Sequence, residues 1–571
     1  MEKNHRGGLI EGCLVLLVLL LNPLNSTFIF DTKSSLPDTF AYIAQAQNLL
    51  DNMQFHTGPW GHVDTALILP PLYPLLIAMV MATGMEGLES ALSISRFSGY
   101  LFSLAAFAYL RAFTGPWLAA VSVLAIQLTY VYFNFATLAL TEPLFLALMM
   151  ATLLLVSRYL ADPAGTGSLR PVALGVACSL VFLCREAGIT VLLLVLILVA
   201  VAQRRDAITR ASALARPLAL VVLGFSALTV PYYAIRGIQT GADPLARSFR
   251  LGHYTVVASD PAIRERAGSM KRGPGATYAD IYSQRRSELE LLPDGSEMLR
   301  FVFFAEGGHK RQDIYGNIIS AIASPGKYVK QVSGKVQLLG RNAGFGILLL
   351  FIITAATSFL LPLKGFPRRL RIIIPLHVIL YILLLALFAS QITRYLAVIV
   401  PLVLIHICLE LHLLLRSCRW PAPSGDRVPA GIVLVLFPLI VLAGSPALFH
   451  AKQIYPRDPL RVERLEVLRG KIGGAPVFAQ FPVFAHAAGG SFRQLPNDGL
   501  DKIARYAEKT GVRWLLVVDI PEERAVMKFW TNAYEWLILK DLQSRYPDVV
   551  EYCCGWHVDE NGYDWRLYSF K

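Results

Sequence analysis

Charged side chains and cysteines are both scarce in this sequence. Asp, Glu, Lys and Arg together make up 16% of the 571 residues, whereas a soluble globular chain carries about 25%. The seven cysteines show no metal-ligand spacing, which argues against a structural zinc module. Cys553 and Cys554 are adjacent, a spacing at which a disulfide forms only with strain. The chain also shows no internal repeat and no low-complexity tract.

Long apolar runs account for the deficit of charge. Hydrophobic side chains make up 55% of the chain. Crossing the hydrocarbon core of a bilayer takes about 20 apolar residues, and no soluble core requires so many runs of comparable length. The sequence therefore predicts a polytopic α-helical membrane protein. Clear examples of such runs are residues 14–24, 192–202 and 373–388.

The formal net charge of +13 would attract polyanions such as nucleic acid. Many basic residues, however, lie in short loops between apolar runs, as in the cluster Lys364, Arg368, Arg369 and Arg371. This is the pattern of cytoplasmic loops, so we expect no nucleic acid partner. With about eleven transmembrane helices, every basic cluster falls on the cytoplasmic side. The predicted spans are residues 9–30, 91–112, 116–136, 143–160, 171–184, 188–203, 216–234, 342–361, 372–389, 395–415 and 430–449.

Residues 67–83 are apolar enough for a further span, but counting them would move every later basic cluster to the outside. Pro70, Pro71 and Pro74 would also break the first turns of a helix there. We therefore interpret this segment as a re-entrant or interfacial helix that returns to the outer side.

Three hydrophilic stretches then face outward, at residues 31–90, 235–341 and 450–571. The last alternates strand-like runs with a helical pattern, which indicates a small soluble α/β domain. The predicted organisation is a transmembrane domain over 1–449, with outer loops 31–90 and 235–341, followed by an extracytoplasmic α/β domain over 450–571. The predicted location is the plasma (inner) membrane, multi-pass, with the C-terminal domain facing the periplasm or exterior.

Two acidic residues stand out at helix starts on the predicted outer side. Asp38 and Tyr42 are spaced i, i+4 and so share one helix face. A carboxylate there could take a proton from an attacking hydroxyl, although Ser35 and Asp38 could equally form a capping box. Glu142 could likewise have either a catalytic or a structural role, since an acid is also favoured in the first turn of a helix that begins near Thr141.

Two arginines lie on the same predicted side. Arg185 is placed at an outward hairpin between two short spans, where it could hold a phosphate or pair with the neighbouring Glu186. Arg394, followed by Tyr395, lies at the outer end of a span, where its planar fork could grip phosphate oxygens or snorkel to the headgroups. A carboxylate base beside a cationic phosphate site is what sugar transfer from a phospholipid donor requires.

The order of short motifs resembles a known family. A first span is followed by Asp38-x-x-x-Tyr42 and by PPLYPLL at 70–76, then by TEPLF at 141–145, CREAG at 184–188 and R-Y-L-x-x-x-x-P at 394–401. This order is similar to that of the C-type glycosyltransferase superfamily, which includes the protein O-mannosyltransferases and the lipid A aminoarabinose transferases. The match covers most of residues 9–410.

The resemblance implies a membrane glycosyltransferase that transfers a sugar from a polyprenyl-phosphate-linked donor to an acceptor on the outer face, with inversion. It implies that Asp38 is the base or the group that orients the acceptor, and that Glu142 is a second catalytic acid. Arg394 with Tyr395, and Arg185, would bind the donor, and Tyr42 would belong to the substrate site. Asp38 and Glu142 could be two oxygen ligands of a divalent cation, but no third acid is convincing, so we expect no metal and no other cofactor.

Two other functions compete with this interpretation. A transporter or flippase of a lipid-linked saccharide would also need a lipid phosphate site, but such proteins often show paired halves with matched broken helices, and the sequence has no such symmetry. A non-catalytic membrane scaffold would not need acids and arginines gathered on one side.

Overall fold

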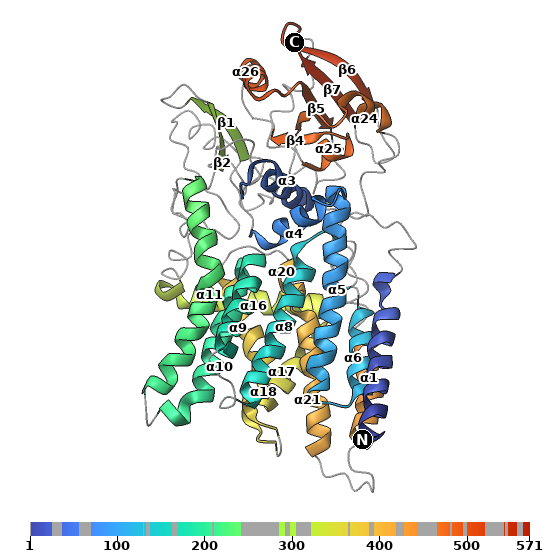
Figure 1. The fold of residues 1–571 in the computed structure, drawn as a ribbon, viewed down its shortest axis with the longest axis vertical. Coiled ribbons are helices and arrows are strands. Elements are labelled where there is room, and N and C mark those ends of the chain that lie inside the picture. The colour runs from blue at the N-terminus through green and yellow to red at the C-terminus, as the bar shows by residue number, and fades with distance from the viewer. Residues whose placement is uncertain are drawn as a thin grey trace. The chain divides into compact units, whose positions relative to one another are not determined.

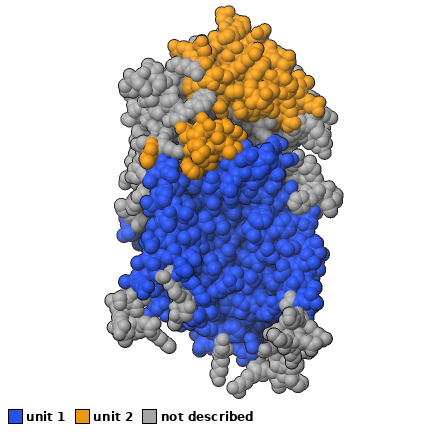
Figure 2. Space-filling model, in the orientation of Figure 1, with its two compact units in different colours: residues 1–34, 70–235, 317–455 blue, residues 35–69, 236–316, 456–571 orange. Residues whose placement is uncertain are grey.

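The chain forms two compact units, coloured in Figure 2. Unit 1 comprises Met1–Ser34, Pro70–Ile235 and Asn317–Tyr455, and unit 2 comprises Ser35–Leu69, Arg236–Gly316 and Pro456–Lys571. The three segments of unit 2 fall within the three hydrophilic stretches that the sequence indicates. The computed structural model describes residues 2–25, 37–55, 70–129, 131–132, 138–162, 169–207, 211–240, 285–291, 297–303, 321–363, 366–387, 393–417, 427–443, 465–479, 482–494, 500–519, 542, 546–556 and 564–571.

Unit 1 is helical, and many of its helices run side by side (Figure 1). Helix α5 packs along α8, α8 along α9, α10 along α19, and α17 along α21. The helices are α1(Glu2–Leu20), α4(Leu72–Met81), α5(Gly87–Arg111), α6(Pro116–Gln127), α8(Thr141–Ala161), α9(Leu169–Cys184), α10(Ile189–Ala207), α11(Ala211–Thr240), α16(Pro325–Ala343), α17(Phe345–Leu360), α18(Arg368–Arg371), α19(Ile373–Ala386), α20(Thr393–Ala397), α21(Val400–Ser417) and α22(Arg427–Ala443), with short 3-10 helices η1(Pro23–Asn25) and η2(Glu186–Gly188).

The outward faces of these helices are apolar. Phe97 is 63% exposed, Leu223 61% and Leu349 59%, and patches of this kind are rare on soluble proteins. Among the described helices, five are long and apolar enough to cross a membrane, or six if the bent pair α16–α17 is one span. These helices indicate a membrane-embedded protein. Each predicted span overlaps at least one helix, and the count of about eleven stays a prediction.

Besides the short α18, two described helices of unit 1, α4 and α16, lie wholly or largely outside the predicted spans. Helix α4 occupies the segment predicted to be re-entrant or interfacial, and its 10 residues reach about 15 Å, half of the hydrocarbon core. Helix α16 falls within the stretch 235–341, where the sequence indicated no helix, and meets α17 at an angle of 117°. Gly344 lies at this bend with a φ of 92°, a conformation that only glycine adopts without strain.

Helices α9 and α11 approach each other closely at two glycines. A Cβ on Gly175 would lie 2.0 Å from the Val221 carbonyl oxygen, and one on Gly224 would lie 2.2 Å from that of Val172. The Ser179 and Thr229 hydroxyls are hydrogen-bonded across the same crossing at 2.7 Å. Small residues and interhelical hydroxyl contacts are the usual means of packing helices in a bilayer.

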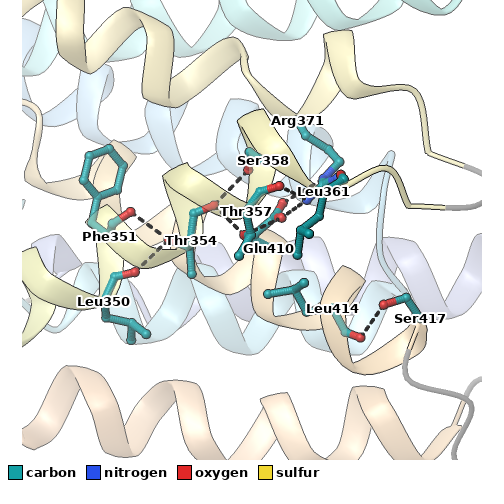
Figure 3. A network of polar contacts seen from close by, with 10 residues as sticks. All are labelled: Leu350, Phe351, Thr354, Thr357, Ser358, Leu361, Arg371, Glu410, Leu414 and Ser417. Atoms are coloured by element: carbon teal, nitrogen blue, oxygen red, sulfur yellow. Dashed lines mark hydrogen bonds and ion pairs between the residues drawn. The ribbon is translucent and has the colours of Figure 1, made fainter.

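A fully buried ion pair joins three helices of unit 1. Arg371 of α18 contacts Glu410 of α21 through both Nε and Nη2, and the two side chains are 1% and 0% exposed. Figure 3 shows the guanidinium between Glu410 and the end of α17, where Nη2 donates to the Thr357 carbonyl at 3.1 Å and Nη1 to that of Leu361. The Thr357 hydroxyl also donates to Glu410 at 3.0 Å.

Arg371 thereby neutralises Glu410 and adds donors at the end of α17, where the Thr357 carbonyl also accepts from the Leu361 amide at 2.9 Å. The sequence grouped Arg371 with the basic residues of a cytoplasmic loop. The structure shows that Arg371 is buried, since the residue is 2% exposed and is paired with Glu410, which comes 39 residues later in the chain. The cytoplasmic side of the cluster stays a prediction.

Replacing Glu410 by Leu should leave the Arg371 guanidinium buried without its carboxylate. Loss of one member of a buried pair costs about 3–5 kcal/mol, so we expect a clearly lower thermal unfolding midpoint for the detergent-solubilised protein. Adding Arg371→Met should restore most of the loss, because no charge then stays buried. Glu11→Leu is the matched control, since Glu11 pairs with Arg111 at 2.5 Å but both side chains are about two-fifths exposed (39% and 41%). Equal midpoints for Glu410→Leu and Glu11→Leu would contradict this role.

Unit 2 contains a five-stranded mixed sheet with strand order β4-β3-β5-β7-β6. Strands β3, β4 and β5 are parallel, and β7 runs antiparallel to β5 and β6. Unit 2 also includes the antiparallel pair β1–β2. The elements are α3(Pro37–Asn52), β1(Arg285–Leu291), β2(Glu297–Phe303), α24(Glu466–Ile472), β3(Pro476–Ala479), α25(Pro482–Ala487), β4(Ser491–Gln494), α26(Leu500–Thr510), β5(Trp514–Asp519), β6(Val550–Trp556) and β7(Asp564–Phe570).

Both faces of this sheet are covered, because side chains on a strand alternate between its faces. On β5, Leu516 and Val518 join a core that includes Phe484 of α25. Leu515 and Val517 join a second core, which includes Ile503 and Ala507 of α26. The five-stranded sheet therefore packs between helices on both faces.

Candidate active site

A second buried ion pair lies within unit 1, between Glu142 and Arg185. The Arg185 Nη1 atom is 3.1 Å from Glu142 Oε1, and the two residues are 8% and 1% exposed. Charges in such surroundings are costly unless they are paired, and they usually mark a functional site in membrane proteins. Both residues were predicted from the sequence as site residues, each separately.

Local structure explains how these charges become neighbours. Glu142 stands in the first turn of α8, which begins at Thr141, and an acid is favoured there by the helix dipole. Arg185 follows the last residue of α9 and adopts an extended conformation, with φ −159° and ψ 129°. The chain then turns through η2 into α10. The end of one helix and the start of another therefore supply the two charges.

Gly188 makes this turn possible. Its amide donates to the Arg185 carbonyl at 2.8 Å, and a Cβ at this position would lie 2.7 Å from backbone atoms of Val181 and Phe182. Since backbone atoms cannot move aside cheaply, only glycine fits here. The glycine of the CREAG motif is thus explained by close packing of η2 on α9.

Aromatic rings surround the guanidinium. The Arg185 Cζ atom lies 4.4 Å from the centre of the Tyr395 ring and 5.9 Å from that of Phe145. Arginine stacks favourably on such rings. The Tyr381 hydroxyl donates to the Tyr395 carbonyl at 3.0 Å, which holds α20 against α19. The Arg185 cation is thus paired with the Glu142 carboxylate and lies against the rings of Tyr395 and Phe145.

The PPLYPLL segment is tied to the same place. The buried Tyr73 hydroxyl lies 3.0 Å from the Ser95 hydroxyl. Ser95 in turn donates to the Leu140 carbonyl at 3.1 Å, two residues before Glu142. Helix α4 is thereby linked through α5 to the start of α8. Two motifs that the sequence shows separately are joined by one chain of hydrogen bonds.

The structure brings together three of the six predicted site residues: Glu142, Arg185 and Tyr395. Arg394 lies in α20 beside Tyr395, and its side chain falls outside the described residues. Asp38 and Tyr42 belong to α3 of unit 2. Tyr42 is 7% exposed, and the Asp38 side chain falls outside the described residues. The roles of these residues stay predictions.

Sequence reasoning missed Phe145, Tyr381 and helix α16. Phe145 could have been found, because it lies three residues after Glu142 and so on the same helix face. Tyr381 lies within an apolar run, and nothing in the neighbouring sequence distinguishes it as a site residue. Helix α16 packs against α19 and α20, and its Lys335 is only 7% exposed. Its glycine-rich, basic sequence lacks the apolar run by which spans were recognised.

Metal ligation depends on a residue whose side chain is not described. Among the described residues, no group of three His, Cys, Asp or Glu side chains could hold a metal ion. The Asp38 side chain, one of the two oxygen ligands considered from the sequence, is not among these described side chains. The expectation of a metal-free site therefore stays a prediction.

Comparisons with known proteins agree with the motif order. A family model described as dolichyl-phosphate-mannose-protein mannosyltransferase matches residues 69–230. The crystal structure of ArnT from Cupriavidus metallidurans in the apo state shares 11% identity and a TM-score of 0.55, covering 99% of this chain and 98% of that one. The same protein bound to undecaprenyl phosphate shares 12% identity and a TM-score of 0.54, covering 98% and 97%.

The archaeal oligosaccharyltransferase AglB from Archaeoglobus fulgidus, in complex with an inhibitory peptide and a dolichol-phosphate, has a TM-score of 0.46 at 13% identity, covering 99% of this chain and 74% of that one. No curated protein matches the sequence. The family match includes PPLYPLL, TEPLF and CREAG, and the fold is shared with ArnT over nearly the whole of both chains. The similarity to C-type glycosyltransferases is therefore supported by the family match over residues 69–230 and by the shared fold.

Proposed function

We propose that this protein transfers a sugar from a polyprenyl-phosphate-linked donor to an acceptor on the outer face of the plasma (inner) membrane, with inversion at the sugar carbon. The family match to a dolichyl-phosphate-mannose-protein mannosyltransferase and the fold shared with ArnT, one of whose structures holds undecaprenyl phosphate, support this proposal. The positive-inside distribution of the basic loops supports the outward orientation.

The buried Arg185 is the observation that carries the proposal. A guanidinium presents five N–H donors in a planar fork that matches phosphate oxygens, and the ion pair with Glu142 uses Nη1. An arriving phosphate would replace contacts of the cation with aromatic faces by charge-assisted hydrogen bonds, which are stronger. Glu142 would keep the cation paired while the donor is absent.

In the proposed reaction, Arg185 and Arg394 hold the donor phosphate and stabilise the charge that grows on it as the glycosidic bond breaks. Asp38 accepts the proton of the acceptor nucleophile. Glu142 orients the guanidinium through their ion pair, which limits its motion during transfer. The site needs no metal in this scheme.

Transfer of radiolabelled sugar tests the proposal. Purified detergent-solubilised protein is given a panel of polyprenyl-phosphate-sugars, with native membrane extract as acceptor. We expect transfer by the wild type and no measurable transfer by Asp38→Asn, while binding of undecaprenyl phosphate is kept, because only proton acceptance is removed. Donor binding without turnover of any donor would favour a flippase. Loss of binding in Asp38→Asn would remove Asp38 from the role of base.

Arg185→Ala should weaken binding of undecaprenyl phosphate by about 10- to 100-fold. Hydrogen bonds to charged groups contribute about 1.5–3 kcal/mol, and each 1.4 kcal/mol is tenfold in Kd. Arg185→Lys, which keeps the charge and loses the planar fork, should give an intermediate Kd. Arg158→Ala, at an exposed position near the other end of α8, is the matched control. Equal Kd values for the Arg185 and Arg158 variants would exclude Arg185 from the phosphate site.

Gly188→Ala should weaken donor binding without removing a charge. The added methyl group meets backbone atoms of α9, so η2 must shift and carry Arg185 away from Glu142. Gly334→Ala in α16 has open space around its Cβ and serves as the control. We expect the Gly188 variant alone to raise the Kd for undecaprenyl phosphate. Unchanged binding would show that Arg185 does not need this turn.

A further inference from the structure

Helix α3, which carries Asp38, packs within unit 2 on the C-terminal α/β fold. It contacts α25, and Ile43 on its second turn packs against the core that Phe484 and Trp565 share. A helix of 16 residues is only marginally stable by itself. Its position therefore depends on the surface against which it packs.

Charge supports the same packing. Within α3 the charged residues are Asp38 and Asp51, both acidic. Asp51 faces Arg493 of β4 closely enough to raise the pKa of that guanidinium, although burial, the larger effect, lowers it overall. Gln47 holds the Asp51 carboxylate in place with a hydrogen bond of 2.9 Å. The last turn of α3 is thus attracted electrostatically to β4, in addition to the apolar contact that Ile43 makes.

The surface beneath α3 is itself firmly built. Phe484 of α25 is fully buried and meets Trp565 of β7 edge to face, with 5.5 Å between the ring centres. The Arg469 Nε atom donates to the Ala487 carbonyl at 3.1 Å, which caps the end of α25. Helix α25 is therefore fixed to the sheet, and a helix that packs on it shares that rigidity.

We propose that the C-terminal α/β fold positions the catalytic base, by holding helix α3 against α25 through Ile43, with the attraction between Asp51 and Arg493 as a second, weaker support. This inference rests on the proposed function, because that function assigns Asp38 the role of base. The packing of α3 on the C-terminal fold does not depend on it. Ile43, Asp51 and Arg493 are positioning residues, since they act on Asp38 only through α3. The fold would then be needed for sugar transfer even where it touches neither donor nor acceptor.

Hydrogen exchange of the full-length, detergent-solubilised protein tests the packing without any assay of activity. Ile43→Asp places a charge against the apolar core, so amide exchange across α3 should accelerate at least tenfold. Exchange across α26, on the other face of the sheet, should stay unchanged and show that unit 2 is still folded. Leu50→Asp is the matched control, because Leu50 lies on the same helix and is 39% exposed. Equal exchange in the two variants would overturn the proposal.

Reversal of the charges of Asp51 and Arg493 tests whether the position of α3 affects catalysis. Asp51→Lys and Arg493→Glu should each lower kcat for transfer by about two- to fivefold, the range expected for two attracting charges in contact with solvent, with Kd for undecaprenyl phosphate unchanged. The double variant should restore kcat, which a general loss of stability would not do. Faster exchange in Ile43→Asp with an unchanged kcat would overturn the positioning role. Absence of transfer by the wild type would instead refute the proposed function. Amide hydrogen exchange would still show whether α3 packs on the C-terminal fold through Ile43.

Discussion

The cost of burying a charge determines how unit 1 is organised. Removing an ion from water costs several kcal/mol even after relaxation, so a buried guanidinium needs a carboxylate and further partners. Arg371 satisfies this need with Glu410 and with backbone carbonyls of α17. Arg185 satisfies it with Glu142 and two aromatic faces. Carbonyls at a helix end are fixed and cannot be exchanged for a ligand, whereas contacts with aromatic faces are weaker than the charge-assisted hydrogen bonds that a phosphate would make. The first pair suits structure and the second suits binding.

The helices and several site residues could be predicted from the sequence because their signals are local. Long apolar runs mark each helix of unit 1 that was predicted as a span, and an acid or an arginine at a helix end stands out against such a background. Glu142, Arg185 and Tyr395 were identified in this way one by one. Their meeting depends on how α8, the turn between α9 and α10, and α20 pack together, and one sequence carries no information on that packing.

The elements that escaped prediction lack a local signal. Helix α16 has Lys335 on its buried face and no apolar run, so only its contacts with α19 and α20 define its role. Arg371 looked like an ordinary basic residue of a cytoplasmic loop because it follows other arginines. Its burial depends on Glu410, whose own position within an apolar run carried no indication of a partner. In both cases long-range packing overrides what the neighbouring residues suggest.

The proposed base and the proposed phosphate site belong to different compact units. Sugar transfer requires that a base and a phosphate cradle be held in a defined geometry, because small displacements cost large factors in rate. Arg185 receives its geometry from helix packing and from the tight turn at Gly188. Helix α3 has no comparable anchor in its own sequence, since it is short and weakly apolar. The C-terminal fold supplies such an anchor, because α3 packs on α25 and Ile43 packs against the core of the sheet. If Asp38 is the base, as proposed, this domain would give rigidity to a helix that lies more than 400 residues upstream in the chain.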